Sequence, residues 1–210
     1  MMSININPEN FEKILDFFQQ AERLKSTIRF SERKKTIRES SAAHSWRLAL
    51  MVFVIAAELK LNLNIEKALK IAIIHDLAES ITGDIDYILI AERKVSKDEK
   101  RKFEEDAMQK IKSSLPNKTG EEIYNLWKEF ENSSTYEAKF VKAIDKIETL
   151  THLLKVGYKV YTRPKLIPNY ADVAVRGFPE LIGILKIIKQ KLKSEFEKGG
   201  IPWKEEYDRF

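Results

Sequence analysis

The chain has no cysteine among its 210 residues, only three histidines, seven glycines and six prolines. Without cysteine there is no disulfide scaffold, no thiolate metal site and no thiol nucleophile. The scarcity of glycine and proline argues against a fibrous or loop-dominated chain. The longest uncharged apolar run, Leu48 to Ala57, is about half of the ~20 residues that a membrane-spanning helix needs.

Charges of both signs are plentiful. Hydrophobic residues make up 43% and charged residues 33% of the chain, a balance that favours a packed core with a solvated surface over disorder. The formal net charge is +5, which suits an anionic small substrate as well as nucleic acid and decides nothing alone. The N-terminal segment lacks the basic start and apolar stretch of a signal peptide. We therefore expect a cytoplasmic protein with no membrane partner.

Helical periodicity dominates the pattern, and no window shows convincing strand alternation. Asn7, Pro8 and Glu9 are typical of a helix start, and Gly83 is placed to end the helix that Asn64 caps. We expect helices over about 8–24, 41–60, 65–80, 97–114, 120–132, 135–158 (capped by Ser133 or Ser134) and 180–198, with a turn at 116–120, an irregular segment at 84–95 and a loop region around 164–179 that has room for one helical turn. The pattern predicts a single all-α domain over 1–210.

Two of the three histidines lie on apolar helix faces. His44 begins the apolar stripe of its helix, and His75 stands on the inward face of the next helix, directly followed by Asp76. Asp145 repeats the anomaly on the long helix, in the segment KFVKAIDKIE. A buried carboxylate without a partner is costly, so it usually pairs or binds a metal. Two imidazoles and two carboxylates from three helices suit a mononuclear Zn, Mn, Co or Fe site with positions left open for water.

Each of these residues has an ordinary explanation when it is taken alone. A lone histidine on an apolar helix face is usually a hydrogen-bonded core residue, and a lone aspartate usually faces solvent or caps a helix. The combination on three helices favours the metal site. His152 lies seven residues after Asp145, roughly 10 Å along the helix, and we interpret it as structural.

Further charged residues flank these candidates. Glu79 is four residues after His75 and shares its helix face, and Asp84 follows in the loop beyond. Either could orient water or act as a general acid, although a surface acid and a turn residue are the ordinary interpretations. The segment before His44 is basic, with Arg29, Arg33, Lys34, Lys35 and Arg38. Arginine matches phosphate oxygens bidentately, whereas a solvated basic loop is the ordinary alternative.

Together these residues resemble a known family. The segments RESSAAHSWRLALM, HDLAESITGDI and EAKFVKAIDKIE are similar to those of HD-domain metal-dependent phosphohydrolases, in particular the 5'-deoxynucleotidase (YfbR-like) branch. The resemblance covers about 24–154 and leaves a C-terminal helical extension over about 159–210. It implies an all-helical fold and hydrolysis of nucleoside 5'-monophosphates, with deoxyribonucleotides favoured. It also implies a homodimer.

The resemblance implies a set of site residues as well. One divalent metal ion, whether Co, Mn, Zn, Fe or Mg, would be held by His44, His75, Asp76 and Asp145. Glu79 and Asp84 match acids that contribute to substrate binding or proton transfer, while Arg29, Phe30 and Arg33 fall at substrate-binding positions.

The sequence departs from the family pattern at two positions. Phe30 stands where the family usually has tryptophan, so a ring N–H donor is lost and sugar discrimination is open to change. Ala43 stands where an acidic residue usually precedes the first histidine.

The expected reaction is metal-assisted hydrolysis of a phosphomonoester to nucleoside and phosphate, with no organic cofactor and no nucleic-acid partner. One alternative is another HD-type hydrolase that acts on a nucleoside triphosphate, a cyclic dinucleotide or a guanosine alarmone. The scarcity of histidine argues against the binuclear versions. A second alternative is a basic helical nucleic-acid-binding protein, whose binding would depend on salt and be indifferent to His75 and Asp76.

Overall fold

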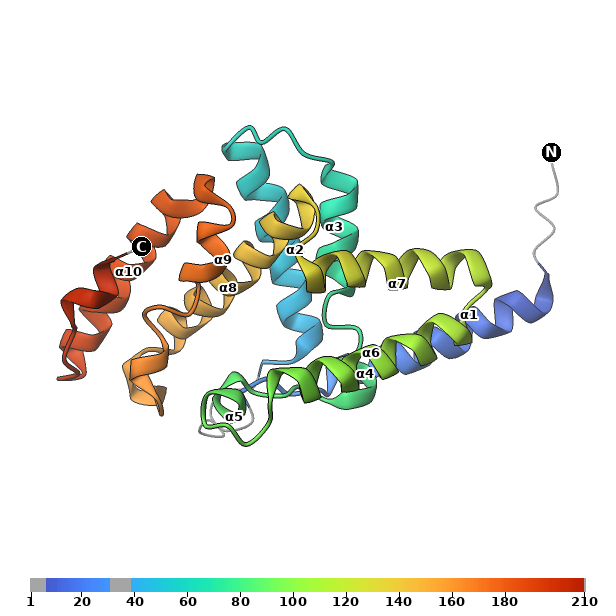
Figure 1. The fold of residues 1–210 in the computed structure, drawn as a ribbon, viewed down its shortest axis with the longest axis horizontal. Coiled ribbons are helices and arrows are strands. Elements are labelled where there is room, and N and C mark those ends of the chain that lie inside the picture. Colours follow the sequence, from blue (N-terminus) through green and yellow to red (C-terminus); the bar gives the residue numbers. More distant parts are fainter. Residues whose placement is uncertain (1–6, 31–38, 210) are drawn as a thin grey trace.

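The structure is a computed structural model that describes residues 7–30 and 39–209. It is built from helices, as the sequence predicts (Figure 1). These are α1 Pro8–Glu22, α2 Ser41–Glu58, α3 Ile65–Ile74, α4 Glu79–Thr82, α5 Tyr87–Ala91, α6 Lys97–Ser114, α7 Asn117–Asn132, α8 Tyr136–Val156, α9 Asp172–Arg176 and α10 Ile182–Lys198, with short 3-10 turns between them. Over the described ranges, the β-type pairing is limited to an antiparallel bridge between Ile28 and Ser40.

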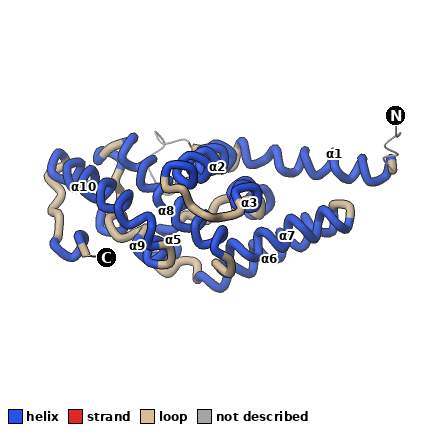
Figure 2. Tube along the Cα trace, turned by 90° about the horizontal axis from the view of Figure 1, so that it is seen from above, coloured by secondary structure: helices blue, strands red, loops and turns tan. Residues whose placement is uncertain are grey.

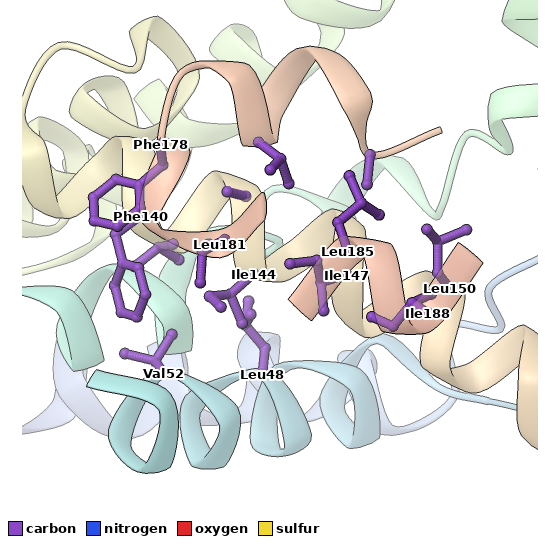
Figure 3. Packing of buried hydrophobic residues seen from close by; sticks show 14 of the residues in the cluster. Leu48, Val52, Phe140, Ile144, Ile147, Leu150, Phe178, Leu181, Leu185 and Ile188 are labelled. Carbon is purple, nitrogen blue, oxygen red and sulfur yellow. The ribbon is translucent and has the colours of Figure 1, made fainter. Parts of the chain in front are cut away.

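Helix α8 forms the centre of the main core. Its buried apolar residues include Phe140, Ile144, Ile147 and Leu150, which neighbouring helices have to cover. Leu48 of α2 packs against it from one side and Leu185 of α10 from the other, with Ile144 of α8 between them (Figure 3). Asp145 and Glu148 are also buried on this helix, and each has an ion-pair partner.

A second, smaller core joins α6, α7 and the start of α4 around Trp127 and Met108. The two long helices approach closely at Gly120, where a Cβ atom would lie 2.3 Å from the carbonyl oxygen of Lys112. The predicted turn at 116–120 is therefore wrong: α7 already begins at Asn117, and the glycine serves close packing of the helices.

Three other local expectations also differ from the structure. The helix expected over 65–80 ends at Ile74, where a set of tight turns begins. The segment expected to be irregular contains α5, whose first turn Asp86 caps by accepting a hydrogen bond from the amide of Ile88. Thr135 caps α8, while Ser133 takes a left-handed conformation (φ 48°) that ends α7.

Helix α1 begins as predicted, with Asn7 accepting from the amide of Glu9 and Pro8 in the first turn. None of its residues is buried, however. Its N-terminal part extends away from the rest of the protein in two orthogonal views (Figures 1 and 2). Across the described ranges, no helix is both long and apolar enough to cross a membrane.

Candidate functional site

The end of α3 gives the site its local geometry. His75 follows the last residue of the helix, and the chain then turns tightly, with the amide of Leu77 bonded to the carbonyl of Ile74 at 2.9 Å. Consecutive side chains on a regular helix point roughly 100° apart, so they rarely bring their polar atoms to the same point. In this turn, Nε2 of His75 and Oδ2 of Asp76 lie only 3.1 Å apart.

Four side chains from three helical segments meet at this point. The Nε2 atom of His44 on α2 is 3.2 Å from Nε2 of His75 and 3.2 Å from Oδ1 of Asp145 on α8. Its distance to Oδ2 of Asp76 is 3.7 Å. We refer to His44, His75, Asp76 and Asp145 as the donor cluster.

Hydrogen bonds orient both imidazole rings of the donor cluster. Nδ1 of His75 lies 2.9 Å from the carbonyl oxygen of Ala72, and Nδ1 of His44 lies 2.6 Å from a carboxylate oxygen of Glu148. Since both partners accept, each Nδ1 donates a proton, which leaves Nε2 of each ring as the atom that would bind a metal ion. A carboxylate or carbonyl behind a histidine is the usual support for a metal ligand.

The electrostatics of the donor cluster favour a cation at its centre. Burial and Arg29 oppose a charged imidazole, yet hydrogen bonds to Asp145 and Glu148 outweigh them and raise the pKa of His44 to about 9. Burial likewise opposes ionisation of Asp76, but the adjacent His75 holds the pKa of this carboxyl well below its usual range. A divalent ion bound here would take the place of the proton on His44. Two nitrogens and two carboxylate oxygens suit Zn, Mn, Co or Fe.

Glu39, His44 and Glu148 form a second group of closely spaced potential ligands. Their carboxylates are already neutralised, however. Arg47 donates from Nε to Glu148 at 2.6 Å, and Nη1 of Arg29 lies 3.1 Å from Glu39, which Nδ1 of His152 also approaches to 3.0 Å. This charge network orients the donor cluster through the hydrogen bond between Glu148 and His44. A metal ion bound within the charge network would have to displace the cations of that network.

The donor cluster borders a cavity of about 750 Å³, which His75, Asp76 and Asp145 help to line. The described lining residues include eight Lys or Arg and eight Asp or Glu. An equal number of opposite charges keeps this polar cavity close to neutral when all of them are ionised.

Arg29 is fixed at one wall of this cavity. Its Nη1 atom is 3.1 Å from Glu39, and Nη2 donates to Thr149 at 3.4 Å. The main chain of Arg29 is also held in place, because the amide of Arg29 donates to the carbonyl of Glu39 at 2.9 Å. Its burial opposes the charge, but Asp76 and other nearby carboxylates raise the pKa of Arg29 further above its usual range. The guanidinium is thus a fixed positive charge beside the donor cluster.

Phe30 is held in an uncommon backbone conformation next to Arg29. Its φ is 61°, a left-handed value that costs energy for a bulky residue. The amide of Phe30 donates to Oδ2 of Asp84 at 3.1 Å, and its ring stacks on His152 with 5.5 Å between the centroids. Asp84 therefore positions the main chain at Phe30.

Glu79 begins α4 directly after the tight turn. It is buried, it lines the cavity, and Ser41 donates to its Oε2 atom at 2.5 Å. Burial, together with the negative charges of Asp76 and Asp84, raises the pKa of Glu79 well above its usual range. Burial also raises the pKa of Asp84. Carboxyl groups of this kind can donate a proton near neutral pH.

A family model described as an HD domain matches residues 21–164 of the chain. The chain belongs to the HD-domain family. This confirms the family resemblance derived from the three sequence segments, and the match extends slightly beyond both ends of the range expected from them.

Several characterised relatives of this HD-domain protein carry the name 5'-deoxynucleotidase. The "5'-deoxynucleotidase HDDC2" of Danio rerio is 32% identical over 194 residues, which cover 90% of this chain and 92% of the relative. The protein of the same name in Mus musculus is 38% identical over 70% of this chain and 71% of its own. The "5'-deoxynucleotidase hdd1" of Schizosaccharomyces pombe is also 38% identical, over 70% and 73%.

Solved structures share the fold of the HD-domain protein. A predicted metal-dependent phosphohydrolase from Magnetospirillum magnetotacticum superposes with a TM-score of 0.74 at 21% identity, covering 93% of this chain and 100% of the other. A conserved hypothetical protein from Pyrococcus furiosus gives a TM-score of 0.62 at 28% identity, covering 82% and 99%.

The HD-domain protein brings together most of the residues that the sequence singles out. The four donors converge, and Glu79, Asp84, Arg29 and Phe30 lie around the same cavity. Arg33, with Lys34, Lys35 and Arg38, lies outside the described residues. His152 belongs to the charge network behind the site, which agrees with its interpretation as structural.

Sequence reasoning missed several charged residues of the HD-domain protein. Glu148 and Arg47 orient His44, and Lys146 lies 2.8 Å from Oδ2 of Asp145. Lys100 of α6 also lines the cavity. Glu148 had a visible signal, since it is three residues after Asp145 on the inward face of an otherwise apolar helix.

Proposed function

We propose that this HD-domain protein is a metal-dependent phosphomonoesterase that hydrolyses deoxynucleoside 5'-monophosphates to nucleoside and phosphate. The observation that carries the proposal is the donor cluster, in which two imidazole nitrogens and two carboxylates meet at the wall of a cavity beside a fixed arginine. The names of the relatives in fish, mouse and fission yeast support the same substrate class.

His44, His75, Asp76 and Asp145 would hold one divalent metal ion. The Nε2 atom of His44 lies 3.2 to 3.7 Å from a donor atom of each of the other three residues, and this spacing and their chemistry fit such an ion. When bound, a metal of this kind polarises a phosphate oxygen and lowers the pKa of water. Elemental analysis of the purified protein should find one equivalent of Co, Mn, Zn, Fe or Mg.

The other residues have separate tasks in the proposed reaction. Arg29 neutralises the charge of the phosphate. Its guanidinium is held in a fixed position because Nη1 donates to Glu39 and Nη2 donates to Thr149. Glu79 holds or transfers a proton at its carboxyl group, which Ser41 fixes through Oε2. Asp84 acts as a positioning residue through the amide of Phe30, and Arg33 is a further candidate for phosphate binding.

The charge of the cavity favours one phosphate group over three. Its eight basic and eight acidic residues cancel when all are ionised, so a divalent ion together with a protonated Glu79 leaves a surplus of about three positive charges. A phosphomonoester at neutral pH carries about 1.5 to 2 negative charges. A triphosphate would leave negative charge uncompensated, and this argues against the alternative substrates of other HD-type hydrolases.

A substrate panel tests the proposed function. With added Co, Mn, Mg or Zn, we expect phosphate release from deoxynucleoside monophosphates at a rate at least about tenfold above that from the triphosphates, which corresponds to ~1.4 kcal/mol in the barrier. Phosphate, pyrophosphate and triphosphate are measured separately. Preferential release of pyrophosphate or triphosphate would instead identify a triphosphohydrolase.

The support for His44 gives a second prediction. Glu148→Gln should retain the side-chain volume but weaken the hydrogen bond to Nδ1 and lower the basicity of Nε2. We expect metal affinity to fall by about 10- to 100-fold, measured by competition with a chelator. Glu137→Gln, on the same helix but without contact to the donor cluster, is the control. Unchanged affinity in Glu148→Gln would remove the supporting role.

We propose one HD-type domain over 1–210, located in the cytoplasm, with the nucleotide as partner and no nucleic acid. A nucleic-acid-binding protein would present its basic residues as an open patch. Here Lys100, Lys142 and Lys146 instead line a cavity and pair with Glu104, Glu131 and Asp145 respectively.

An exposed apolar surface on α1, α2 and α3 supports the proposed homodimer. Phe18 is 59% exposed, Trp46 68% and Ile73 60%. They line a groove of about 780 Å³ together with Leu15 and Leu24. A contiguous apolar surface of this kind usually marks an interface, and a second copy of the chain would cover the helix that has no buried residue.

Sedimentation velocity tests this interface. We expect the wild-type protein to sediment as a dimer and Trp46→Glu to sediment as a monomer, because a charge would be buried without a partner. Phe103→Glu, on the exposed face of α6, should remain dimeric. A monomeric wild type, or a dimer that survives Trp46→Glu, would exclude this surface.

A further inference from the structure

We infer that Tyr87 and Tyr170 form a subsite that holds the nucleobase of the substrate by stacking. The inference deepens the proposed function and rests on it. Tyr87 belongs to α5, and Tyr170 lies in the C-terminal extension, beyond the last residue of the family match at 164. Both residues line the same cavity as the donor cluster.

The two tyrosines form an aromatic corner. Their ring centroids are 5.1 Å apart and the planes are inclined by 77°. The edge of one ring is directed at the other, so ring surface is left open for a further aromatic partner. Tyr87 is 42% exposed, which is more than a ring of this size needs if its role is only to pack the fold.

The neighbouring residues make this end of the cavity apolar. Ile90 of α5, Leu166 and Val173 line it beside the tyrosines, and Val173 is 74% exposed. An ion pair of 2.7 Å between Arg163 and Glu92 ties the chain just after α5 to the chain that leads into Tyr170. The corner is thus built from two segments that are held together independently of the rings.

A short chain of contacts sets the corner's position relative to the donor cluster. The hydroxyl of Tyr170 is 3.5 Å from Nζ of Lys146, and Nζ is 2.8 Å from Oδ2 of Asp145. The ammonium group also lies 5.3 Å from the ring centroid of Tyr170. Only the ammonium group of Lys146 therefore separates the aromatic corner from the donor cluster. A nucleotide whose phosphate binds at the donor cluster could place its base at the corner, with the sugar between them.

Stacking explains what such a subsite would select. Every nucleobase has a π-face, so an aromatic platform binds all bases with little discrimination among them. The charged and polar part of the cavity recognises the phosphate, whereas the corner recognises the presence of a base. The C-terminal extension consequently takes part in substrate binding.

A base-free substrate isolates this contribution. We compare a deoxynucleoside monophosphate with 2-deoxyribose 5-phosphate in the metal-loaded wild type, Tyr87→Ala, Tyr170→Ala and Tyr170→Phe. For the nucleotide, each alanine variant should raise KM about tenfold with little change in kcat. KM for the sugar phosphate should stay unchanged. Tyr170→Phe keeps the ring and should recover most of the nucleotide KM that Tyr170→Ala loses, and Tyr136→Ala, whose residue does not line the cavity, is the control.

The possible failures are distinguishable. Equal KM for the nucleotide and the sugar phosphate in the wild type, or equal losses on both substrates in the alanine variants, would overturn the subsite and leave the phosphomonoesterase intact. If the wild type hydrolyses neither substrate, the proposed function fails. Calorimetric titration of a deoxynucleoside monophosphate then decides the subsite, because only a stacking role predicts that Tyr170→Ala weakens binding much more than Tyr170→Phe does.

Discussion

Asp76→Ala is expected to release the bound metal and to reduce phosphate release from deoxynucleoside monophosphates to background. Asp76 supplies one of the two carboxylates of the donor cluster, and its Oδ2 atom lies within 3.7 Å of the Nε2 atoms of both histidines. Without it, the site keeps two nitrogens and one carboxylate and loses a negative charge that faces the cation. Metal content by elemental analysis and phosphate release are measured on the same preparation.

The fold of the variant should persist, because Asp76 is half-buried at a turn rather than packed in the main core. Circular dichroism should show nearly unchanged helical content. Added metal should raise the melting temperature of the wild type, since a ligand that binds only the folded state stabilises it, but it should not raise that of Asp76→Ala. Asp106→Ala, at an exposed position of α6, should behave as the wild type.

If Asp76→Ala retains its metal, the ion must bind at a site other than the donor cluster. The other closely spaced group, Glu39, His44 and Glu148, would then be the candidate. Because that group is neutralised by Arg47 and Arg29, metal binding there predicts that Arg47→Ala strengthens the affinity. The donor cluster predicts no such gain. The two variants together therefore distinguish the two sites.

The donor cluster could be predicted because its members break the pattern of their helices. His44 and Asp145 stand at inward positions of apolar stripes, and helical periodicity is enough to recognise an inward position. The break after Ile74 could not be predicted in this way, since IAIIHDLAES continues the same apolar period. The tight turn there accompanies tertiary contacts of His75 and Asp76 with His44. Local helix propensity carries no information about such contacts.

Other differences have similar physical causes. Gly120 suggests a turn from sequence, but its missing side chain is used for the close approach of α6 and α7. The apolar residues of α1 recur at helical spacing, which fits burial in the chain's own core and burial at an interface equally well. Phe18 is 59% exposed, and the proposed homodimer would cover it. A single chain cannot show the difference between these two kinds of burial.

Glu79→Gln should keep the metal and bind nucleotide but lose turnover by about 10²- to 10⁴-fold. Glu79 does not belong to the donor cluster, and the hydrogen bond from Ser41 engages only Oε2 of its carboxyl group. Burial and the charges of Asp76 and Asp84 raise its pKa well above the usual range, so the group is protonated at pH values where an ordinary glutamate is ionised. Glutamine matches its shape but cannot transfer the proton.

The pH dependence separates this role from a purely structural one. If Glu79 acts as the acid, wild-type kcat should fall as the pH rises through its elevated pKa, and Glu79→Gln should lack that decline while remaining slow throughout. Glu58→Gln, at an exposed position near the end of α2, controls for the loss of a charge. Near-normal turnover in Glu79→Gln would exclude the proton-transfer role. Loss of metal would instead make Glu79 a ligand, because a residue that only handles protons has no reason to change the metal content.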